Sequence, residues 1–164
     1  MASPMAYSLS LSDTLFEQAG LRFGLDPLLI YSVALAESGA GRGNGNVSPW
    51  AWTLRAPKKP FYADSQEEAE EVLASFIERY GSSIDVGYMQ INIKWHGDRV
   101  ENHSDLLDPE TNICLGSEIL KTAIASAPDD LILGVGRYHH WADESRSRMY
   151  GKRVLRIYEG LKQL

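Results

Sequence analysis

Apolar residues recur at helical spacing along most of the chain. The segment LLIYSVALAE, which follows Asp26-Pro27, is apolar on nearly all sides, and this pattern is typical of a central helix surrounded by others. Asp accepts hydrogen bonds from the unpaired N–H groups at a helix start, and Pro has no N–H there, so the pair predicts where this helix begins. The pattern ends near Glu37. We therefore expect a mainly-α fold around a buried central helix.

Further helices are predicted on both sides of this segment. In chain order they begin at Ser12 or Asp13, at Asp64 or Ser65, at Asp108-Pro109, after Pro128, and near Glu144, where Met149, Val154, Ile157, Tyr158 and Leu161 would face inward. The stretch SPWAWTLRAPKKPFY is rich in proline and aromatic residues, which predicts an irregular excursion or a short β-hairpin near residues 50–62. The Gly- and Asn-rich loop GAGRGNGN is interpreted as a helix C-cap and a turn.

Length and charge narrow the class of protein. A chain of 164 residues fits one domain, spanning 1–164. The net charge is −6, and basic residues cluster only at Arg146, Arg148, Lys152, Arg153 and Arg156, which we interpret as a solvated helix face, so we expect no nucleic-acid partner. Cys114 is the only cysteine, which excludes an intrachain disulfide and is expected to be a buried thiol.

The first ten residues, MASPMAYSLS, lack the charged and apolar regions of a secretory signal. Either a signal has been removed from this chain or none is needed.

Glu37 is a carboxylate at the end of an apolar helix. Burial and the negative end of the helix dipole both disfavour its ionisation, so its pKa should rise. A carboxyl that keeps its proton near neutral pH can act as a general acid. A solvated glutamate in the last turn is the simpler alternative.

Two further segments could carry chemistry. In Ser83-Ile84-Asp85-Val86-Gly87-Tyr88-Met89-Gln90-Ile91-Asn92, the amides Gln90 and Asn92 alternate with apolar residues, and amides suit sugar hydroxyl and acetamido groups, although an ordinary half-buried strand has the same pattern. In Arg137-Tyr138-His139-His140, the Tyr138 hydroxyl could bond a carboxyl. Neighbouring histidines point in different directions on a helix, so we expect no metal site.

Taken together, these segments resemble the lytic transglycosylases of the soluble, goose-type-lysozyme-like family. The family pattern of Glu-Ser, Gly-Leu-Met-Gln-Ile, an Asn-Ile helix and Ala-Tyr-Asn appears here in the same order as Glu37-Ser38, Gly87-Tyr88-Met89-Gln90-Ile91-Asn92, Asn112-Ile113 with Gly116, and Arg137-Tyr138-His139. Tyr88 stands where the family has Leu, and His139 where it has Asn. The forms SPWAWTL and DVGYMQIN look most like members that accompany conjugation and type IV secretion or pilus systems.

The resemblance implies a lysozyme-like fold and cleavage of the bond between N-acetylmuramic acid and N-acetylglucosamine, with formation of a 1,6-anhydro ring. It implies Glu37 as the catalytic acid and base, and it places Ser38, Ser83, Met89, Gln90, Asn92 and Tyr138 at the substrate, with Tyr138 bonded to the acid. No cofactor is needed. The expected partners are peptidoglycan glycan strands and components of a conjugation or secretion complex, and the expected state is a monomer in the periplasm or cell envelope.

Two alternatives stay open. One is a hydrolase of lysozyme type, in which Asp85 positions a water; the mass of the product separates it from a transglycosylase. The other is a non-catalytic glycan-binding module of an envelope machine, with Trp50, Trp52 and Tyr62 as its platform. The role of the excursion from residue 49 to 80 is left open.

Overall fold

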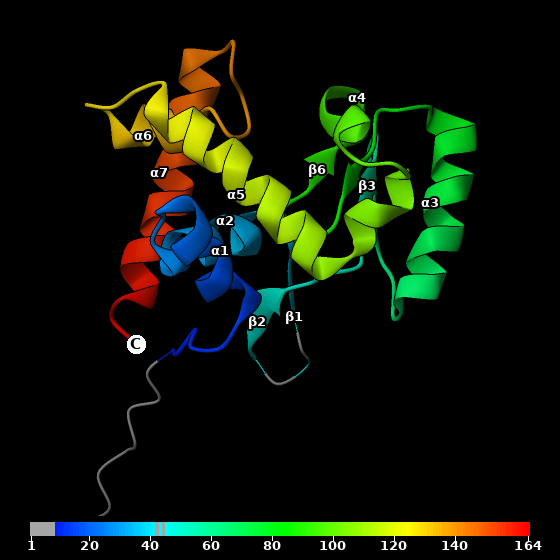
Figure 1. Ribbon diagram of the computed structural model, residues 1–164, viewed down its shortest axis with the longest axis horizontal. Helices are drawn as coiled ribbons and strands as arrows, with labels where there is room; N and C mark the ends of the chain where they lie inside the picture. Colours follow the sequence, from blue (N-terminus) through cyan, green and yellow to red (C-terminus); the bar gives the residue numbers. More distant parts are fainter. Residues whose placement is uncertain (1–8, 42, 44) are drawn as a thin grey trace, which may run out of the picture. The chain divides into compact units, whose positions relative to one another are not determined.

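The computed structural model describes residues 9–41, 43 and 45–164 (Figure 1). The prediction about a secretory signal therefore falls largely on residues 1–8, outside the described part, as do positions 42 and 44 of the Gly- and Asn-rich loop. The chain divides into two compact units, which we call the terminal unit, residues 1–32 and 120–164, and the central unit, residues 33–119.

In the described part of the terminal unit, all the secondary-structure elements are helices. They are α1 (Leu15–Phe23), the first part of α2 (Pro27–Ser38), the end of α5 (Pro109–Ala125), α6 (Leu131–Gly136) and α7 (Glu144–Leu161). The predicted start of α1 is corrected by one residue, because Thr14 is its N-cap and accepts the Glu17 N–H through its side chain. Gly24 ends α1 in the left-handed conformation, as its position predicts.

The helix α2 begins at the Asp-Pro pair, as predicted. Asp26 Oδ1 accepts the Leu28 N–H at 2.8 Å, and Asp26 Oδ2 accepts the Tyr158 hydroxyl of α7 at 2.6 Å. That hydrogen bond, together with burial, raises the pKa of Tyr158 to about 12. Along α2, Ile30, Val33 and Ala34 are fully buried, so the prediction of a buried central helix is confirmed.

The inner face of α7 differs from the predicted one. Met149 is 71% exposed, whereas the buried positions are Ser147, Tyr150, Gly151 and Val154. Small residues allow α6 and α7 to approach closely: a Cβ on Gly151 would lie 2.0 Å from the Ile132 carbonyl oxygen. Because the face with small residues packs inward, the larger Met149 is turned outward.

The central unit holds all the strands of the described residues. A two-stranded antiparallel sheet joins β1 (Gly39–Gly41) to β2 (Val47–Pro49), and a four-stranded antiparallel sheet has the order β4-β3-β5-β6, with β3 at Thr53–Ala56, β4 at Lys59–Tyr62, β5 at Asp85–Val86 and β6 at Ile91–Asn92. The hairpin predicted near 50–62 is confirmed as β3 and β4. The loop interpreted only as a C-cap and turn instead begins with β1, which pairs with β2 directly after the loop.

The helices of the central unit surround this sheet. They are α3 (Gln66–Tyr80), α4 (Ile93–His96), the 3-10 turns η1 (Gly97–Arg99) and η2 (His103–Leu107), and the first part of α5. Ser65 caps α3 through the Glu68 N–H, which confirms its predicted start, and α3 runs along β3 (Figure 1). Cys114 on α5 is half-buried rather than buried.

The two faces of the four-stranded sheet differ in chemistry. Successive side chains of a strand point to opposite faces, and the register pairs Leu54 with Val86 and Val86 with Ile91, all of them buried. On the other face, the register places Arg55, Asp85 and Asn92 side by side. The polar face therefore carries groups that could meet a ligand.

Among the described residues there are seven α-helices and six short strands, so the mainly-α prediction is confirmed. Within that part of the chain, no helix combines the length and apolar character that crossing a bilayer requires.

Candidate active site

Glu37 lies in the last turn of α2, and its side chain is only 6% exposed. It follows the apolar residues that make α2 a buried helix, so its carboxyl sits where water is largely excluded. Desolvation of this kind favours the protonated form of a carboxyl. The structure therefore provides the burial on which the predicted rise in pKa depends, and that rise stays a prediction.

Ser38 connects the end of α2 to the second motif. Its hydroxyl donates to the Tyr88 carbonyl at 2.7 Å and to the Ala34 carbonyl at 3.0 Å, and it accepts the Trp50 N–H at 3.2 Å. The side chain is fully buried. Ser38 thereby holds the helix end that carries Glu37 against the turn between β5 and β6.

That turn is tight and depends on two unusual backbone conformations. Gly87 has a φ of +82° and Gln90 a φ of +48°, and the Gln90 N–H donates to the Gly87 carbonyl at 3.2 Å. A Cβ on Gly87 would lie 2.2 Å from Asn112 Nδ2, so no larger residue fits there. The left-handed conformation of Gln90 is stabilised by its side chain, whose Nε2 donates to the Thr53 and Gly87 carbonyls at 3.1 and 3.0 Å.

Asn112 fastens the same turn to α5. Its Nδ2 donates to the Val86 and Leu106 carbonyls, and its Oδ1 accepts the Met89 N–H, each at 2.8 Å. Asn112 is 1% exposed. Asn112 belongs to one of the sequence motifs, but its structural role is not predicted there; a lone Asn in the first turn of an apolar helix is the signal that could have revealed it.

Met89 is fully buried and packs on α5. A Cβ on Gly116 would lie 2.4 Å from the Met89 sulfur, so the glycine makes room for this side chain. Its contacts indicate that Met89 packs between the turn and α5 and so stabilises the turn. Three of the four sequence motifs, those of Glu37, Gly87 and Asn112, are therefore joined in the central unit by direct contacts.

The polar face of the sheet holds a second carboxyl. Asn92 Nδ2 donates to Asp85 Oδ1 at 2.7 Å, and Arg55 lies opposite Asp85 in the register. Burial raises the pKa of Asp85 above its ordinary value of 3.8, while the bond from Asn92 and the charge of Arg55 act against the rise. Asp85 thus fixes the orientation of the Asn92 amide.

This pKa makes the stability of the fold depend on pH. A raised pKa means that the folded state holds the proton of Asp85 more tightly than the unfolded chain does. The stabilising contribution is then complete below pH 3.8 and is lost as the pH rises through the folded value. We expect Asp85→Asn to gain unfolding free energy relative to the parent protein as the pH increases over that window.

Urea unfolding of both proteins between pH 3 and 8 measures this difference. Asp98→Asn, at an exposed position, controls for the removal of one carboxyl. If the unfolding free energies of the parent protein and Asp85→Asn change with pH in parallel, the raised pKa of Asp85 is contradicted.

Two amide oxygens in this region are buried without a hydrogen-bond partner among the residues that the structure describes. They are Gln90 Oε1 and Asn92 Oδ1, whose NH₂ groups are both committed to protein acceptors. A buried acceptor left unsatisfied costs about 1–3 kcal/mol, so native proteins rarely keep one without a reason. Both oxygens can accept a hydrogen bond from a ligand N–H or O–H group that reaches them.

Tyr138 lies in the terminal unit, just after α6. Its ring stacks on Tyr150 of α7, with centroids 6.5 Å apart, and His139 also stacks on Tyr150 at 4.8 Å. Tyr150 is therefore the neighbour that packs against Tyr138 where the family's Asn is replaced by His139. Tyr150 is not among the residues predicted from the sequence, although its i, i+4 spacing to Val154 indicates that both lie on one helix face.

The remaining predicted residue, Ser83, is exposed between α3 and β5. No group of three or more His, Cys, Asp or Glu side chains within the described residues could hold a metal ion.

A mainly helical fold in which the helix end that carries the buried Glu37 is held against the turn between β5 and β6 is consistent with a lysozyme-like domain. A family model described as the transglycosylase SLT domain matches residues 14–148. The chain therefore belongs to the transglycosylase SLT family, and membership implies a peptidoglycan substrate. Comparison with curated proteins found no match, and comparison with solved structures found none.

Proposed function

We propose that this protein is a lytic transglycosylase that cleaves the β-1,4 bond between N-acetylmuramic acid and N-acetylglucosamine and leaves a 1,6-anhydro end. The observation that carries the proposal is the hydrogen bond from Ser38 to the Tyr88 carbonyl. It holds the helix end that carries the buried Glu37 against the turn that leads to Gln90 and Asn92, whose amide oxygens are buried without a hydrogen-bond partner among the described residues.

Glu37 performs both proton transfers in this scheme. Its protonated carboxyl donates to the glycosidic oxygen as the bond to C1 breaks, and the substrate's acetamido oxygen stabilises C1. The carboxylate then takes the proton of the C6 hydroxyl, whose oxygen bonds to C1 and closes the anhydro ring. No water is consumed, so one carboxyl suffices, in contrast to the pair that most glycosidases use.

Some of the remaining site residues bind the substrate, and others hold those residues in position. Gln90 and Asn92 bind the substrate through their amide oxygens, which can accept from acetamido N–H and sugar hydroxyl groups. Ser38 and Met89 act by positioning, because both side chains are fully buried. Ser83 contacts substrate from the exposed rim.

Hydrolysis is the second candidate reaction, and the observation behind it is the desolvated carboxyl of Asp85. Asp85 accepts a hydrogen bond from Asn92 and lies opposite Arg55 in the register. These contacts explain why a carboxylate stands at this position, so no role in activating a water is needed to explain it. Mass spectrometry of the products from purified sacculi separates the reactions. Anhydro ends, lighter by one water than reducing ends, support transglycosylation, and reducing ends alone would contradict it.

A non-catalytic glycan-binding role would use the aromatic residues Trp50, Trp52 and Tyr62. The Trp50 Nε1 donates to the Ala63 carbonyl at 2.7 Å, and the Trp50 ring meets Trp52 edge to face. Of the three only Tyr62 is exposed, at 45%. These contacts favour a packing role for both tryptophans over a flat sugar platform.

Tyr138 is expected to support the acid, as the family resemblance implies. Tyr138→Phe should lower turnover of sacculi by about one to two orders of magnitude, because one orienting hydrogen bond is lost while the ring is kept. Initial rates of anhydro-muropeptide release measure the effect. Tyr62→Phe, at an exposed hydroxyl, is the matched control. Equal rates for Tyr138→Phe and the parent would remove Tyr138 from the site.

We further propose that residues 1–164 act as a single monomeric domain in the periplasm or cell envelope, opening the wall for a conjugation or secretion apparatus. The support is the likeness of SPWAWTL and DVGYMQIN to members that accompany such systems. Transfer frequency in cells carrying Glu37→Gln tests this role, and unchanged transfer would contradict it.

A further inference from the structure

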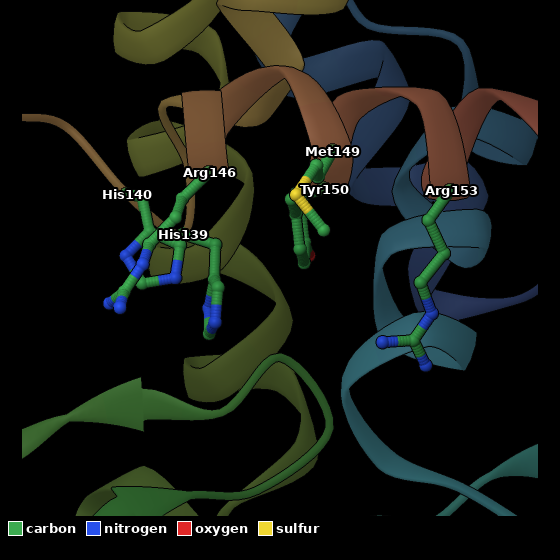
Figure 2. Close-up of a pocket in the computed structure, with 6 residues that line it drawn as sticks. All are labelled: His139, His140, Arg146, Met149, Tyr150 and Arg153. Carbon is green, nitrogen blue, oxygen red and sulfur yellow. The ribbon is translucent and has the colours of Figure 1, made fainter. Parts of the chain in front are cut away.

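A cavity of about 370 Å³ lies in the terminal unit, beside the N-terminal half of α7. Its lining is cationic and aromatic, and consists of His139, His140, Arg146, Met149, Tyr150 and Arg153. Figure 2 shows the two histidines near Arg146, with Met149 and Tyr150 in the middle and Arg153 farther along the helix. Its volume lies in the range of small-ligand sites.

One face of α7 supplies four of these residues, at positions 146, 149, 150 and 153. This i, i+3, i+4, i+7 spacing places them in a single row. Arg148 belongs to another face and bonds Asp130 at 2.8 Å and Glu144 at 2.9 Å. The basic cluster interpreted as a solvated helix face is therefore divided, since two of its arginines line a cavity.

Positive charge dominates the cavity. Arg146 Nε lies 3.5 Å from Asp143 Oδ2, and the two side chains are 68% and 51% exposed. An ion pair so exposed is screened by water and contributes little, so Arg146 keeps the capacity to bind an anion. Arg153 adds a second guanidinium at the other end of the row.

Between the two arginines the wall is apolar. His139 stacks on Tyr150 at 4.8 Å and meets His140 edge-on at 4.4 Å, while Met149 is 71% exposed. The small residues of α7 pack against α6, so Met149 is turned outward and lies beside Tyr150 in the lining of the cavity. Such a wall suits the carbon skeleton of a ligand whose charges lie at its ends.

We propose that this cavity binds the peptide stem of peptidoglycan through its carboxylates, an inference that rests on the proposed function. Arg146 and Arg153 are seven residues apart, so a helical rise of about 1.5 Å per residue separates them by about 10.5 Å along the axis of α7. An extended peptide covers that length with about three residues. Stem peptides carry carboxylates at this spacing, on the γ-linked glutamate and on the residues that follow it, so each guanidinium pairs with one of them.

Binding of the tripeptide L-Ala-γ-D-Glu-meso-diaminopimelate to the full chain tests the proposal by calorimetry. Arg146→Gln and Arg153→Gln should each raise its Kd roughly tenfold, because each loses one charge-assisted contact. Arg156→Gln, an exposed position of α7 outside the lining, should leave the Kd unchanged. A tripeptide with its carboxylates amidated should bind at least tenfold more weakly than the parent peptide.

The results that overturn the proposal are equal Kd values for Arg146→Gln, Arg153→Gln and Arg156→Gln, or tighter binding of glycerol 3-phosphate than of the tripeptide. The second result would assign the cavity to a phosphate ester. Thermal unfolding of each variant verifies that it is folded.

A second measurement separates this inference from the proposed function. Turnover is compared on sacculi and on the same glycan after its peptides have been removed by an amidase. The ratio of the rate on sacculi to the rate on the peptide-free glycan should fall about tenfold in Arg146→Gln and Arg153→Gln. It should stay constant in Arg156→Gln. No turnover on either substrate by the parent protein would refute the proposed function alone, because peptide binding is measured independently. An unchanged ratio in all variants would overturn the stem assignment alone.

Discussion

Glu37→Gln is expected to abolish release of anhydro-muropeptides from purified sacculi. The amide has the shape of the carboxyl but can neither give a proton to the glycosidic oxygen nor take one from the C6 hydroxyl. General acid–base catalysis contributes about 10²–10⁴-fold to a rate, and one group serves both steps here, so the loss should reach the upper end of that range. Chromatography of the soluble products measures it.

The same variant should remain folded and should still bind glycan. Glu37 is 6% exposed, and replacing a buried carboxyl by an amide of equal size leaves its packing unchanged. Glu110→Gln, at an exposed position of α5, is the matched control and should retain parental turnover. Parental turnover by Glu37→Gln would place the acid elsewhere, whereas lost glycan binding would show that Glu37 serves structure instead of catalysis.

Asn112→Ala should produce the largest loss of stability among single substitutions in the central unit. It deletes three hydrogen bonds of 2.8 Å and leaves one N–H and two carbonyl groups buried. At about 1–3 kcal/mol for each unsatisfied group, and allowing for non-additivity, the free energy of unfolding should fall by about 3–5 kcal/mol. Urea unfolding measures it, with Lys121→Ala, at an exposed position of α5, as the control.

If Asn112→Ala does not fold, a second and milder substitution still tests the prediction. Asn112→Asp keeps the acceptor for the Met89 N–H but turns a carboxylate toward the Val86 and Leu106 carbonyls. Protonation restores one O–H donor, so the deficit of Asn112→Asp should shrink as the pH falls. A loss below 0.5 kcal/mol for Asn112→Ala, on the order expected of a surface change, would refute the role of this side chain.

Turnover should fall with stability in the Asn112 variants. The turn from Gly87 to Gln90 is held on one side by Asn112 and on the other by the Gln90 amide. Loss of the Asn112 contact should let the Gln90 oxygen leave the position in which we propose that it binds the substrate. A variant that is folded in the assay but turns over slowly would reveal this effect apart from unfolding.

Local patterns were sufficient for the helix starts. The Asp26-Pro27 pair and Ser65 act through hydrogen bonds to the residues that follow them, so their effect can be predicted from neighbouring positions. The same holds for the buried character of α2, because a segment that is apolar all round has no face to offer to water.

The inner face of α7 could not be predicted in this way. Val154 faces inward as expected, but Met149 does not, because α6 approaches α7 at Gly136 and Gly151, where a Cβ would meet backbone atoms at 2.0 Å. Hydrophobicity alone favours methionine over glycine for the interior. The contact that reverses this choice comes from another helix, and nothing near position 149 in the sequence indicates it.

The sequence by itself determined the mainly helical class, the start of α2 at Asp26-Pro27 and the residue types of the active-site motifs. These depend on interactions within a few residues and on the order of the motifs along the chain. Only the tertiary structure decided that Ser38 bonds the Tyr88 carbonyl, that Asn112 bonds the turn from α5, and that the amide oxygens of Gln90 and Asn92 are buried without a hydrogen-bond partner among the described residues. Such partners lie 23 to 50 positions apart, and folding alone brings them within hydrogen-bond distance.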